Sequence, residues 1–431
     1  MIEDEENTAH LSMFPTELLL YIFTYLSGRQ LIRCREVCSR WKIVIDGTVQ
    51  SDFLWRRHTV CDFKNICFHA RQRTRTEILW FELYRNLCAW RILSKAVETR
   101  DEFASASMIS QEIRGFEILP EGSVGVHTKG SIDYYDIETL ARSRRGVIHG
   151  DFSRYTETTE YLILMNFHLH LFIIRKLIPT KTPNSITFNN VKTFILIEHK
   201  VYFVNLNDEI HICNLQNWEM EGKFIKKSDD CIMCLGSTDE KLHILTFQRN
   251  IYTLEGRDLV FECCLGPNTN LLHQLRKYNF LDQLDWRIYF QWMYILSHTV
   301  PDGPLRDIVT IRAYGDAYFV GSNWGVLRIY FAPYPDGEFD IFNTEPVKQY
   351  NFMERYDCPV LSMCPILMID VMEGERGHTV LIAMPKKIAV LNFNHDYETP
   401  QVQAVLSIEE KRKLNCTVVV EEVDPSPVGC Q

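Results

Sequence analysis

The stretch FPTELLLYIFTYLSGRQLIRCREVCSRWKIVIDGTVQSDFLW, from Phe14 to Trp55, organises this chain. Pro15 suits a first helical turn, and Glu17 places an acid where the helix dipole favours one. Apolar residues then recur at helical spacing until Ser27-Gly28 ends the helix: Leu18, Leu19, Ile22, Phe23 and Leu26. A second set continues the pattern, namely Leu31, Cys34, Val37, Cys38 and Trp41, and Phe53-Leu54-Trp55 closes the unit. The stretch predicts three short helices.

So small a unit cannot bury both sides of its first helix by itself, so part of the apolar stripe should dock on something else. In order and spacing, the stretch resembles an F-box, the motif by which substrate receptors attach to the Skp adaptor of Skp–cullin–F-box ubiquitin ligases. The matching residues are Pro15, Glu17-Leu18-Leu19, Ile22-Phe23, Leu26, Leu31, Val37-Cys38, Trp41 and Leu54-Trp55. Phe14 stands where F-boxes usually carry Leu.

The resemblance implies an adaptor-binding set made of Phe14, Pro15, Leu18, Leu19, Ile22, Phe23, Leu26, Leu31, Val37 and Trp41. It also implies a cullin and a RING subunit reached through the adaptor. The alternative is an ordinary amphipathic helical hairpin that packs on the rest of the protein.

Length and composition indicate a folded protein of two or three domains, with 431 residues and 46% hydrophobic residues. No apolar run is long enough for a membrane span, and the acidic start MIEDEENTAH does not resemble a signal peptide. We therefore expect a soluble protein of the cytoplasm or nucleus, with its 14 scattered cysteines reduced. Residues 29–100 carry 15 Lys and Arg against 7 Asp and Glu, but the net charge of −10 gives no support for nucleic-acid binding.

The pattern divides the chain into an acidic tail at 1–10, the F-box at 11–58 and a helical linker at 59–102. A β-rich domain follows at 103–400, and a tail at 401–431 contains a possible ring-closing strand. In receptors that this chain resembles, linker helices hold the F-box rigidly against the substrate domain.

A repeat runs through the β-rich part, where a turn pair precedes an alternating strand. The pairs are Lys129-Gly130, Phe167-His168, Asn207-Asp208, Arg249-Asn250, Trp286-Arg287, Trp324-Gly325 and Lys386-Lys387, separated by 38, 40, 42, 37, 38 and 62 residues. A spacing near 40 residues is typical of β-propeller blades, so we expect about seven. The domain resembles a WD-repeat propeller, but no blade ends in Trp-Asp. An antiparallel sandwich or two stacked β domains would also fit the alternation.

The sequence contains only weak motifs for metal binding and none of the common catalytic motifs considered below. Cys231 and Cys234 form C-x-x-C without a second ligand pair, and His168 and His170 share one side of a strand without a third ligand nearby. The sequence contains no G-x-x-x-x-G-K-[ST], G-x-S-x-G or H-E-x-x-H motif. We therefore expect no catalytic residues, metal or cofactor.

Basic residues between strands are candidates for binding a protein substrate. Arg142, Arg144 and Arg145 follow the first repeat strand, and Lys226 and Lys227 follow a later one. Arginine clusters bind phosphate or carboxylate groups, and receptors similar to this one often read phosphorylated segments. A solvated loop is the alternative interpretation.

The sequence thus predicts α+β architecture, with a three-helix F-box and linker helices before an all-β propeller. The expected function is that of a non-catalytic substrate receptor of a Skp–cullin–F-box ubiquitin ligase. The alternatives are an F-box scaffold that acts outside ubiquitination and a β-rich metal-binding protein or enzyme.

Overall fold

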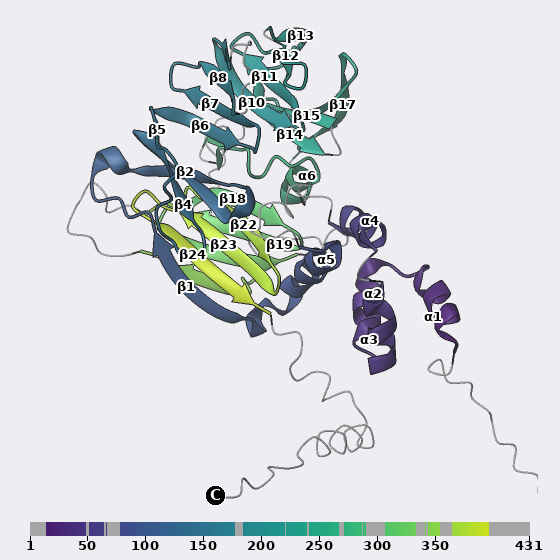
Figure 1. The fold of residues 1–431 in the computed structure, drawn as a ribbon. Helices are drawn as coiled ribbons and strands as arrows, with labels where there is room; N and C mark the ends of the chain where they lie inside the picture. Colours follow the sequence, from purple (N-terminus) through teal and green to yellow (C-terminus); the bar gives the residue numbers. More distant parts are fainter. Residues whose placement is uncertain are drawn as a thin grey trace, which may run out of the picture.

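The structure is a computed structural model that describes residues 14–48, 51–63, 66, 78–176, 184–219, 221–238, 241–266, 271–286, 288–289, 307–332, 341, 344–353 and 364–395. Helices form its N-terminal part and antiparallel sheets form the remainder (Figure 1). This confirms the predicted fold class. None of the described helices combines the length and the apolar character that crossing a membrane requires.

Four short helices open the chain: α1 (Thr16–Phe23), α2 (Gly28–Arg35), α3 (Ser39–Asp46) and α4 (Asp52–Asp62). Pro15 precedes the first turn of α1, as expected. Ser27 caps α2 in a reciprocal pair with Gln30, which satisfies amide groups at the helix start. The sequence predicted three helices, but the closing motif around Trp55 begins a fourth, which runs on to Asp62.

A fifth helix, α5 (Trp80–Ala89), and the 3₁₀ helix η3 (Trp90–Lys95) connect this unit to the sheets. Trp90 is buried and stacks on His378, with ring centroids 3.8 Å apart. Asn86 donates hydrogen bonds from Nδ2 to Glu373 (3.2 Å) and to the Gly374 carbonyl (2.6 Å). One hydrophobic core therefore extends from Leu19 in α1 through α5 to Phe393 in the last sheet.

The described residues form six four-stranded antiparallel sheets. The first sheet contains β2 (Ile113–Ile118), β3 (Ser123–Thr128), β4 (Ser131–Asp136) and β5 (Ile148–His149). The second contains β6 (Phe152–Glu157), β7 (Tyr161–Asn166), β8 (Leu171–Arg175) and β9 (Ser185–Phe188). The third contains β10 (Val191–Ile197), β11 (Lys200–Asn205), β12 (Glu209–Asn214) and β13 (Lys223–Lys227). The fourth contains β14 (Ile232–Thr238), β15 (Lys241–Thr246), β16 (Asn250–Glu255) and β17 (Asp258–Cys264). The fifth contains β18 (Ile308–Tyr314), β19 (Ala317–Ser322), β20 (Val326–Phe331) and β21 (Lys348–Asn351). The sixth contains β22 (Met368–Gly374), β23 (Gly377–Ala383), β24 (Ile388–Asn394) and, from the start of the β-rich part, β1 (Val97–Phe103).

The sheets are arranged as the blades of a propeller. The first strand of a sheet lies beside that of its neighbour for β22 and β2, β2 and β6, β10 and β14, and β18 and β22. Arg154 on β6 donates to Thr193 on β10 over 2.7 Å and links another pair of blades. The short helix α6 (Leu271–Lys277) and the residues after it pack between the blades that start with β14 and β18.

The ring is closed by β1, which is the fourth strand of the last blade and pairs with β24 along its whole length. The β-rich domain therefore begins at Val97, inside the predicted helical linker, rather than at 103. The predicted closing strand at 401–431 lies outside the described residues. Because β1 directly follows η3, the last blade contains both an early and a late part of the chain.

The turn pairs predicted from the repeat join consecutive strands at six of their seven positions, from Lys129-Gly130 to Lys386-Lys387. The exception is Trp286-Arg287, where 286, 288 and 289 are helical, so the strand predicted there is wrong. Trp286 and Tyr289 are both buried and pack with α6 against neighbouring blades. Aromatic residues that alternate over a short run fit either structure, and here tertiary packing favours the helix.

Trp90 should be essential for attachment of the helices to the ring. Trp90→Ala removes a large buried ring, and we expect the free energy of unfolding to fall by about 3–5 kcal/mol. Trp324→Ala is the matched control, because Trp324 is 52% exposed; it should change stability by no more than about 0.5 kcal/mol. Urea unfolding followed by circular dichroism measures both. Equal losses would contradict the assigned role.

The closing strand also carries a pH-sensitive contact. Glu98 on β1 accepts hydrogen bonds from Lys348 (2.8 Å), Tyr350 (2.8 Å) and Arg100 (2.7 Å). Burial opposes its ionisation, but these three donors outweigh burial and lower the pKa of Glu98 to about 2. The stabilisation is therefore complete above the ordinary value of 4.5 and is lost as the pH falls towards 2.

We expect Glu98→Gln to flatten the dependence of thermal unfolding temperature on pH between 4.5 and about 2. Asp101→Asn, on the same strand at an exposed position, is the control and should keep the wild-type slope. Melting curves across this range decide the question. A wild-type slope in Glu98→Gln would show that the contact does not contribute.

Candidate functional site

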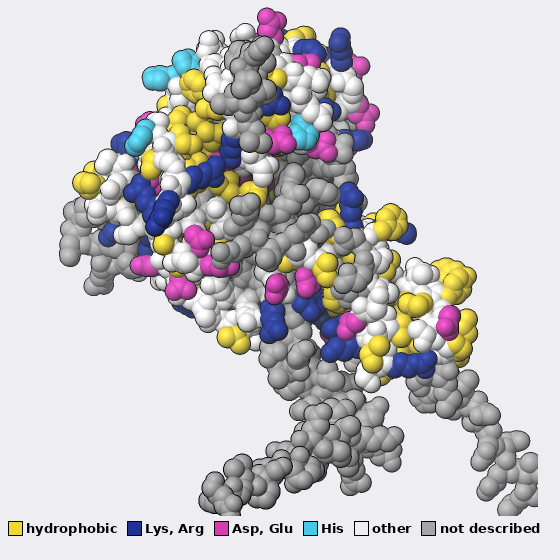
Figure 2. Space-filling model, viewed as in Figure 1, with side chains coloured by type: hydrophobic (Ala, Val, Ile, Leu, Met, Phe, Trp, Pro, Cys, Tyr) yellow, Lys and Arg dark blue, Asp and Glu magenta, His cyan; other side chains and the backbone are white. Residues whose placement is uncertain are grey.

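Helix α1 has one side packed and one side exposed. Leu19 and Phe23 are buried, and the Phe23 ring meets Trp41 edge to face with centroids 5.5 Å apart. On the other side, Leu18 is 50% exposed and Tyr21 is 62% exposed. The exposed large hydrophobic residues of this helix and the turn after it are Leu18, Leu20, Tyr21, Ile22 and Tyr25. Figure 2 shows hydrophobic side chains gathered over α1, at the right of the molecule.

Helix α3 extends the exposed apolar surface. Val44 and Ile45 are buried, whereas Ile43 is 71% exposed. Between α1 and α3 lies a groove of about 510 Å³ lined by Thr16, Leu20, Ser39, Arg40, Ile43, Val44, Gly47 and Thr48. We name the exposed apolar residues of this region, Leu18, Leu20, Tyr21, Ile22, Tyr25 and Ile43, the α1 face. A surface of this kind on a folded domain is typical of a protein-binding site.

The predicted adaptor-binding residues divide into three groups. Pro15, Leu18, Ile22 and Val37 are exposed, and Phe14, Leu26 and Trp41 are partly buried. The remaining three, Leu19, Phe23 and Leu31, lie in the core, which corrects their assignment to a partner surface. Spacing alone places Leu18 and Leu19 in one stripe, but helix packing separates them because adjacent residues differ by about 100° around the axis.

Sequence reasoning missed Leu20, Tyr21, Tyr25 and Ile43. The run Leu18-Leu19-Leu20-Tyr21-Ile22-Phe23 is apolar on every side of the helix. Such a helix needs covering on all sides, which is the signal that could have identified the additional residues. Tyr21 and Tyr25 also contact each other, with a 2.6 Å hydrogen bond between their hydroxyl groups.

The predicted substrate-binding arginines lie in the connection between β4 and β5, and two of them are already paired. Arg142 forms an ion pair with Asp133, and Arg145 pairs with Glu157 over 2.5 Å while its guanidinium lies over the Tyr134 ring. Among the residues that the structure describes, Arg144 is exposed and has no ion-pair partner. The three residues therefore do not form an open cluster of free charges.

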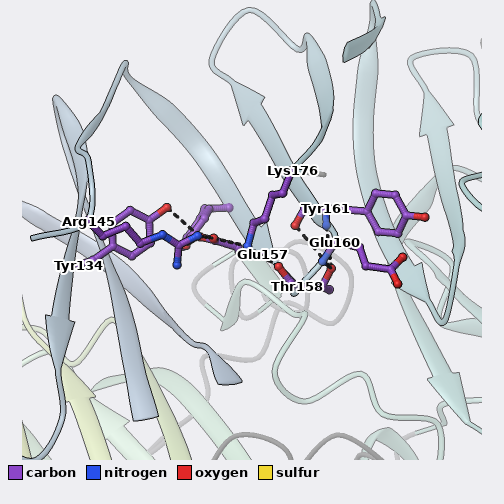
Figure 3. A network of polar contacts seen from close by, with 8 residues as sticks. Tyr134, Arg145, Glu157, Thr158, Glu160, Tyr161 and Lys176 are labelled. Atoms are coloured by element: carbon purple, nitrogen blue, oxygen red, sulfur yellow. Dashed lines mark hydrogen bonds and ion pairs between the residues drawn. The ribbon is translucent and has the colours of Figure 1, made fainter. Parts of the chain in front are cut away.

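Glu157, at the end of β6, is the centre of this polar network, and its side chain is fully buried. Figure 3 shows Arg145 and Lys176 approaching it from different blades. It accepts hydrogen bonds from Tyr134 over 2.9 Å and from Tyr155, and it pairs with Lys176. The pKa of the Lys176 amine is lowered, because the effect of its burial outweighs the opposite effect of Glu157. The network joins two blades and gives Arg145 a structural role.

Lys226 and Lys227 do not lie near these arginines. Successive strands are antiparallel, so connections between first and second or third and fourth strands lie on one side of the ring. Arg142, Arg144 and Arg145 are on that side, together with the β18–β19 turn that contacts α2. Lys226 and Lys227 end the fourth strand β13, and this end of the strand lies on the opposite side of the ring. The Lys226 side chain pairs with exposed Asp258 of the neighbouring blade over 3.2 Å.

The side chains considered for metal binding are separated by the fold. Cys234 is buried in β14, whereas Cys231 is exposed and lies 3.1 Å from the Lys192 amine. His168 and His170 occupy the β7–β8 turn with ring centroids 6.4 Å apart. In the described part of the chain, no group of three or more His, Cys, Asp and Glu residues is arranged to hold a metal ion.

Comparison with known proteins agrees with the helical part. Residues 12–61 match the F-box-like family model. No curated protein sequence matches the chain. Among solved structures, Hsv2 from Kluyveromyces marxianus is similar at 12% identity, covering 64% of this chain and 76% of that one, with a TM-score of 0.32. Hsv2 from Kluyveromyces lactis is similar at 14% identity, covering 64% and 90%, with a TM-score of 0.32.

The match covers α1 to α4 almost completely and includes every residue of the α1 face. The exposed surface is thus part of a known kind of protein-interaction domain, and the blades belong to a separate all-β part. The chain carries an F-box-like domain at residues 12–61, followed by a propeller of four-stranded blades.

Proposed function

We propose that this protein is the substrate-recognition subunit of a Skp–cullin–F-box ubiquitin ligase. The α1 face binds the Skp adaptor, and through it the cullin and RING subunits. The propeller holds a protein substrate. The observation that carries the proposal is the division of α1 into a packed side and an exposed apolar side within an F-box-like domain.

The energetics of the α1 face support a stable contact. Fully burying a large apolar side chain stabilises by roughly 1.5–3 kcal/mol. Leu18, Tyr21, Tyr25 and Ile43 are each at least half exposed, so a partner that covers them gains a large share of that free energy. The groove between α1 and α3 offers the same partner a place for a protruding apolar side chain.

Under this proposal the protein performs no chemistry. A receptor accelerates ubiquitin transfer by raising the effective concentration of a substrate lysine near the loaded conjugating enzyme. The attachment of α5 and η3 to the last blade is suited to such a role, because it joins the F-box-like helices and the propeller through one continuous core.

Leu18→Asp combined with Ile22→Asp tests adaptor binding. Both positions are exposed, so the domain should still fold, but the changes put two carboxylates into an apolar interface. We expect affinity for purified Skp adaptor to fall by at least about 100-fold, a loss near 2.7 kcal/mol. Isothermal titration calorimetry with the full chain measures it.

The matched control is Val97→Asp combined with Val260→Asp, which introduces the same charges at exposed valines of the ring. This variant should bind the adaptor like the wild type. If the wild type does not bind the adaptor, or if both double variants bind equally well, the proposal is wrong.

The scaffold alternative differs in what happens to the bound protein. A receptor shortens the half-life of its substrate, whereas a scaffold does not. Comparing protein half-lives in cells that contain the wild type or the Leu18→Asp, Ile22→Asp variant separates the two. Longer half-lives for a defined set of proteins in the variant support the receptor.

Arg144 is the remaining candidate for contact with an acidic or phosphorylated substrate. It is exposed, and neighbouring Arg145 is held by the buried carboxylate of Glu157. Arg142 and Arg145 would have to exchange their present carboxylate partners for a ligand, so Arg144 is the better first contact. Lys226 and Lys227 belong to the other side of the ring and would serve a separate contact.

A further inference from the structure

We infer that the segment 271–286, which begins with α6, acts as a brace that fixes the direction in which the F-box-like helices leave the ring, through a bridge made by Arg276, Asp316 and Arg29. The inference rests on the proposed function only for its consequence in ubiquitin transfer. Its structural content concerns this chain alone. The described residues of this segment include α6 and lie where the repeat spacing predicts a blade.

The centre of the bridge is Asp316, in the turn between β18 and β19, whose side chain is 1% exposed. Arg29 on α2 binds it with its two terminal guanidinium nitrogens: Nη1 lies 2.5 Å from Oδ2 and Nη2 lies 3.0 Å from Oδ1. Paired bonds between a planar guanidinium and a carboxylate fix orientation as well as distance. This contact joins an F-box-like helix directly to a blade, independently of α5.

Arg276 on α6 approaches Asp316 from another side, with Nη2 3.9 Å from Oδ1. Arg276 is also buried, donates to the Ala332 carbonyl over 3.0 Å and to the Gly315 carbonyl, and lies over the Tyr318 ring. It therefore fixes the start of β19, the end of β20 and the turn that holds Asp316. Two arginines on one buried carboxylate offset the cost of burying its charge.

The turn between β18 and β19 lies so close to α5 that it requires a glycine. Gly315 has a φ of +56°, and a Cβ atom there would lie 3.0 Å from Leu87 on α5. Glycine permits this left-handed conformation and lets α5 approach closely. The carboxylate of Asp316 is thereby held beneath α2 and α5, where Arg29 meets it.

The brace is anchored in the ring at its other end. Gln283 accepts a hydrogen bond over 2.7 Å from Arg154 on β6, and Asp282 pairs with Arg312 on β18. Asn279 donates to the Ser237 carbonyl on β14 over 2.8 Å. The segment contacts the first strands of three blades and reaches Asp316 through Arg276, so it connects the ring to the F-box-like helices (Figure 1).

The experiment measures a distance within the isolated chain. Phe53 on α4 is 80% exposed and Phe261 on β17 is 56% exposed, so both accept p-acetylphenylalanine and a keto-reactive spin label. This chemistry leaves the cysteines unlabelled. Pulsed electron–electron double resonance then gives the distribution of distances between the F-box-like helices and the ring. We expect a narrow distribution for the wild type.

Arg29→Met and Arg276→Met test the bridge, because methionine keeps an apolar stem and removes the guanidinium. Each should broaden the distance distribution roughly twofold or more, as released hinges do. Arg35→Met is the matched control. Arg35 binds Asp46 with two nitrogens at 2.6 and 3.2 Å, and both residues lie within the F-box-like helices. Its guanidinium also lies 5.7 Å from the Phe81 ring centroid on α5, where the apolar stem of methionine keeps a contact. The control should keep the wild-type width.

A wild-type distribution in Arg29→Met would overturn the inference, and so would equal broadening in Arg35→Met. If Arg276→Met does not fold, the Arg29→Met variant alone decides the result. The Arg29 side chain is 30% exposed, so this variant should fold. Adaptor affinity is measured in parallel. Absence of adaptor binding in the wild type would end the proposed function and leave the brace intact, whereas normal affinity with a broadened distance supports the brace.

Discussion

The structure depends on the need to bury the apolar surface of α1, which the helical unit cannot do completely. Its sequence is apolar around the whole circumference, yet a helical unit this small has room for only one of its sides. Leu19 and Phe23 are buried on the side that packs against α2 and α3. Leu18, Tyr21 and Ile22 lie on the other side and are exposed to water. The exposed side is therefore a consequence of the amount of apolar surface in the sequence, and under the proposed function the Skp adaptor covers it.

The sequence predicts the helical domain well because several independent local signals agree there: Pro15 before the first turn, Glu17 within that turn and apolar residues at helical spacing. The turns of the blades are predictable for a similar reason. A tight turn needs particular residues, and Asn166, Asn205 and Ser322 each accept backbone hydrogen bonds at such a turn.

What the sequence does not predict depends on contacts between distant segments. Leu18 and Leu19 are neighbours of identical type, and only packing against Trp41 and its surroundings separates the exposed from the buried one. Arg145 looks like a free cation until Glu157 is placed beside it by an adjacent blade. The helical character of residues near Trp286 follows from the surfaces of two blades, which no local pattern records.

The closing of the ring by β1 has a consequence for how the protein is made. The helices and β1 leave the ribosome before the other strands of the ring, but β24, which pairs with β1, and His378, on which Trp90 stacks, are among the last described residues to be synthesised. The seat of the N-terminal helices is thus incomplete during most of translation. Until the final blade emerges and joins the two ends of the domain, these helices lack the packing partners that the last sheet provides.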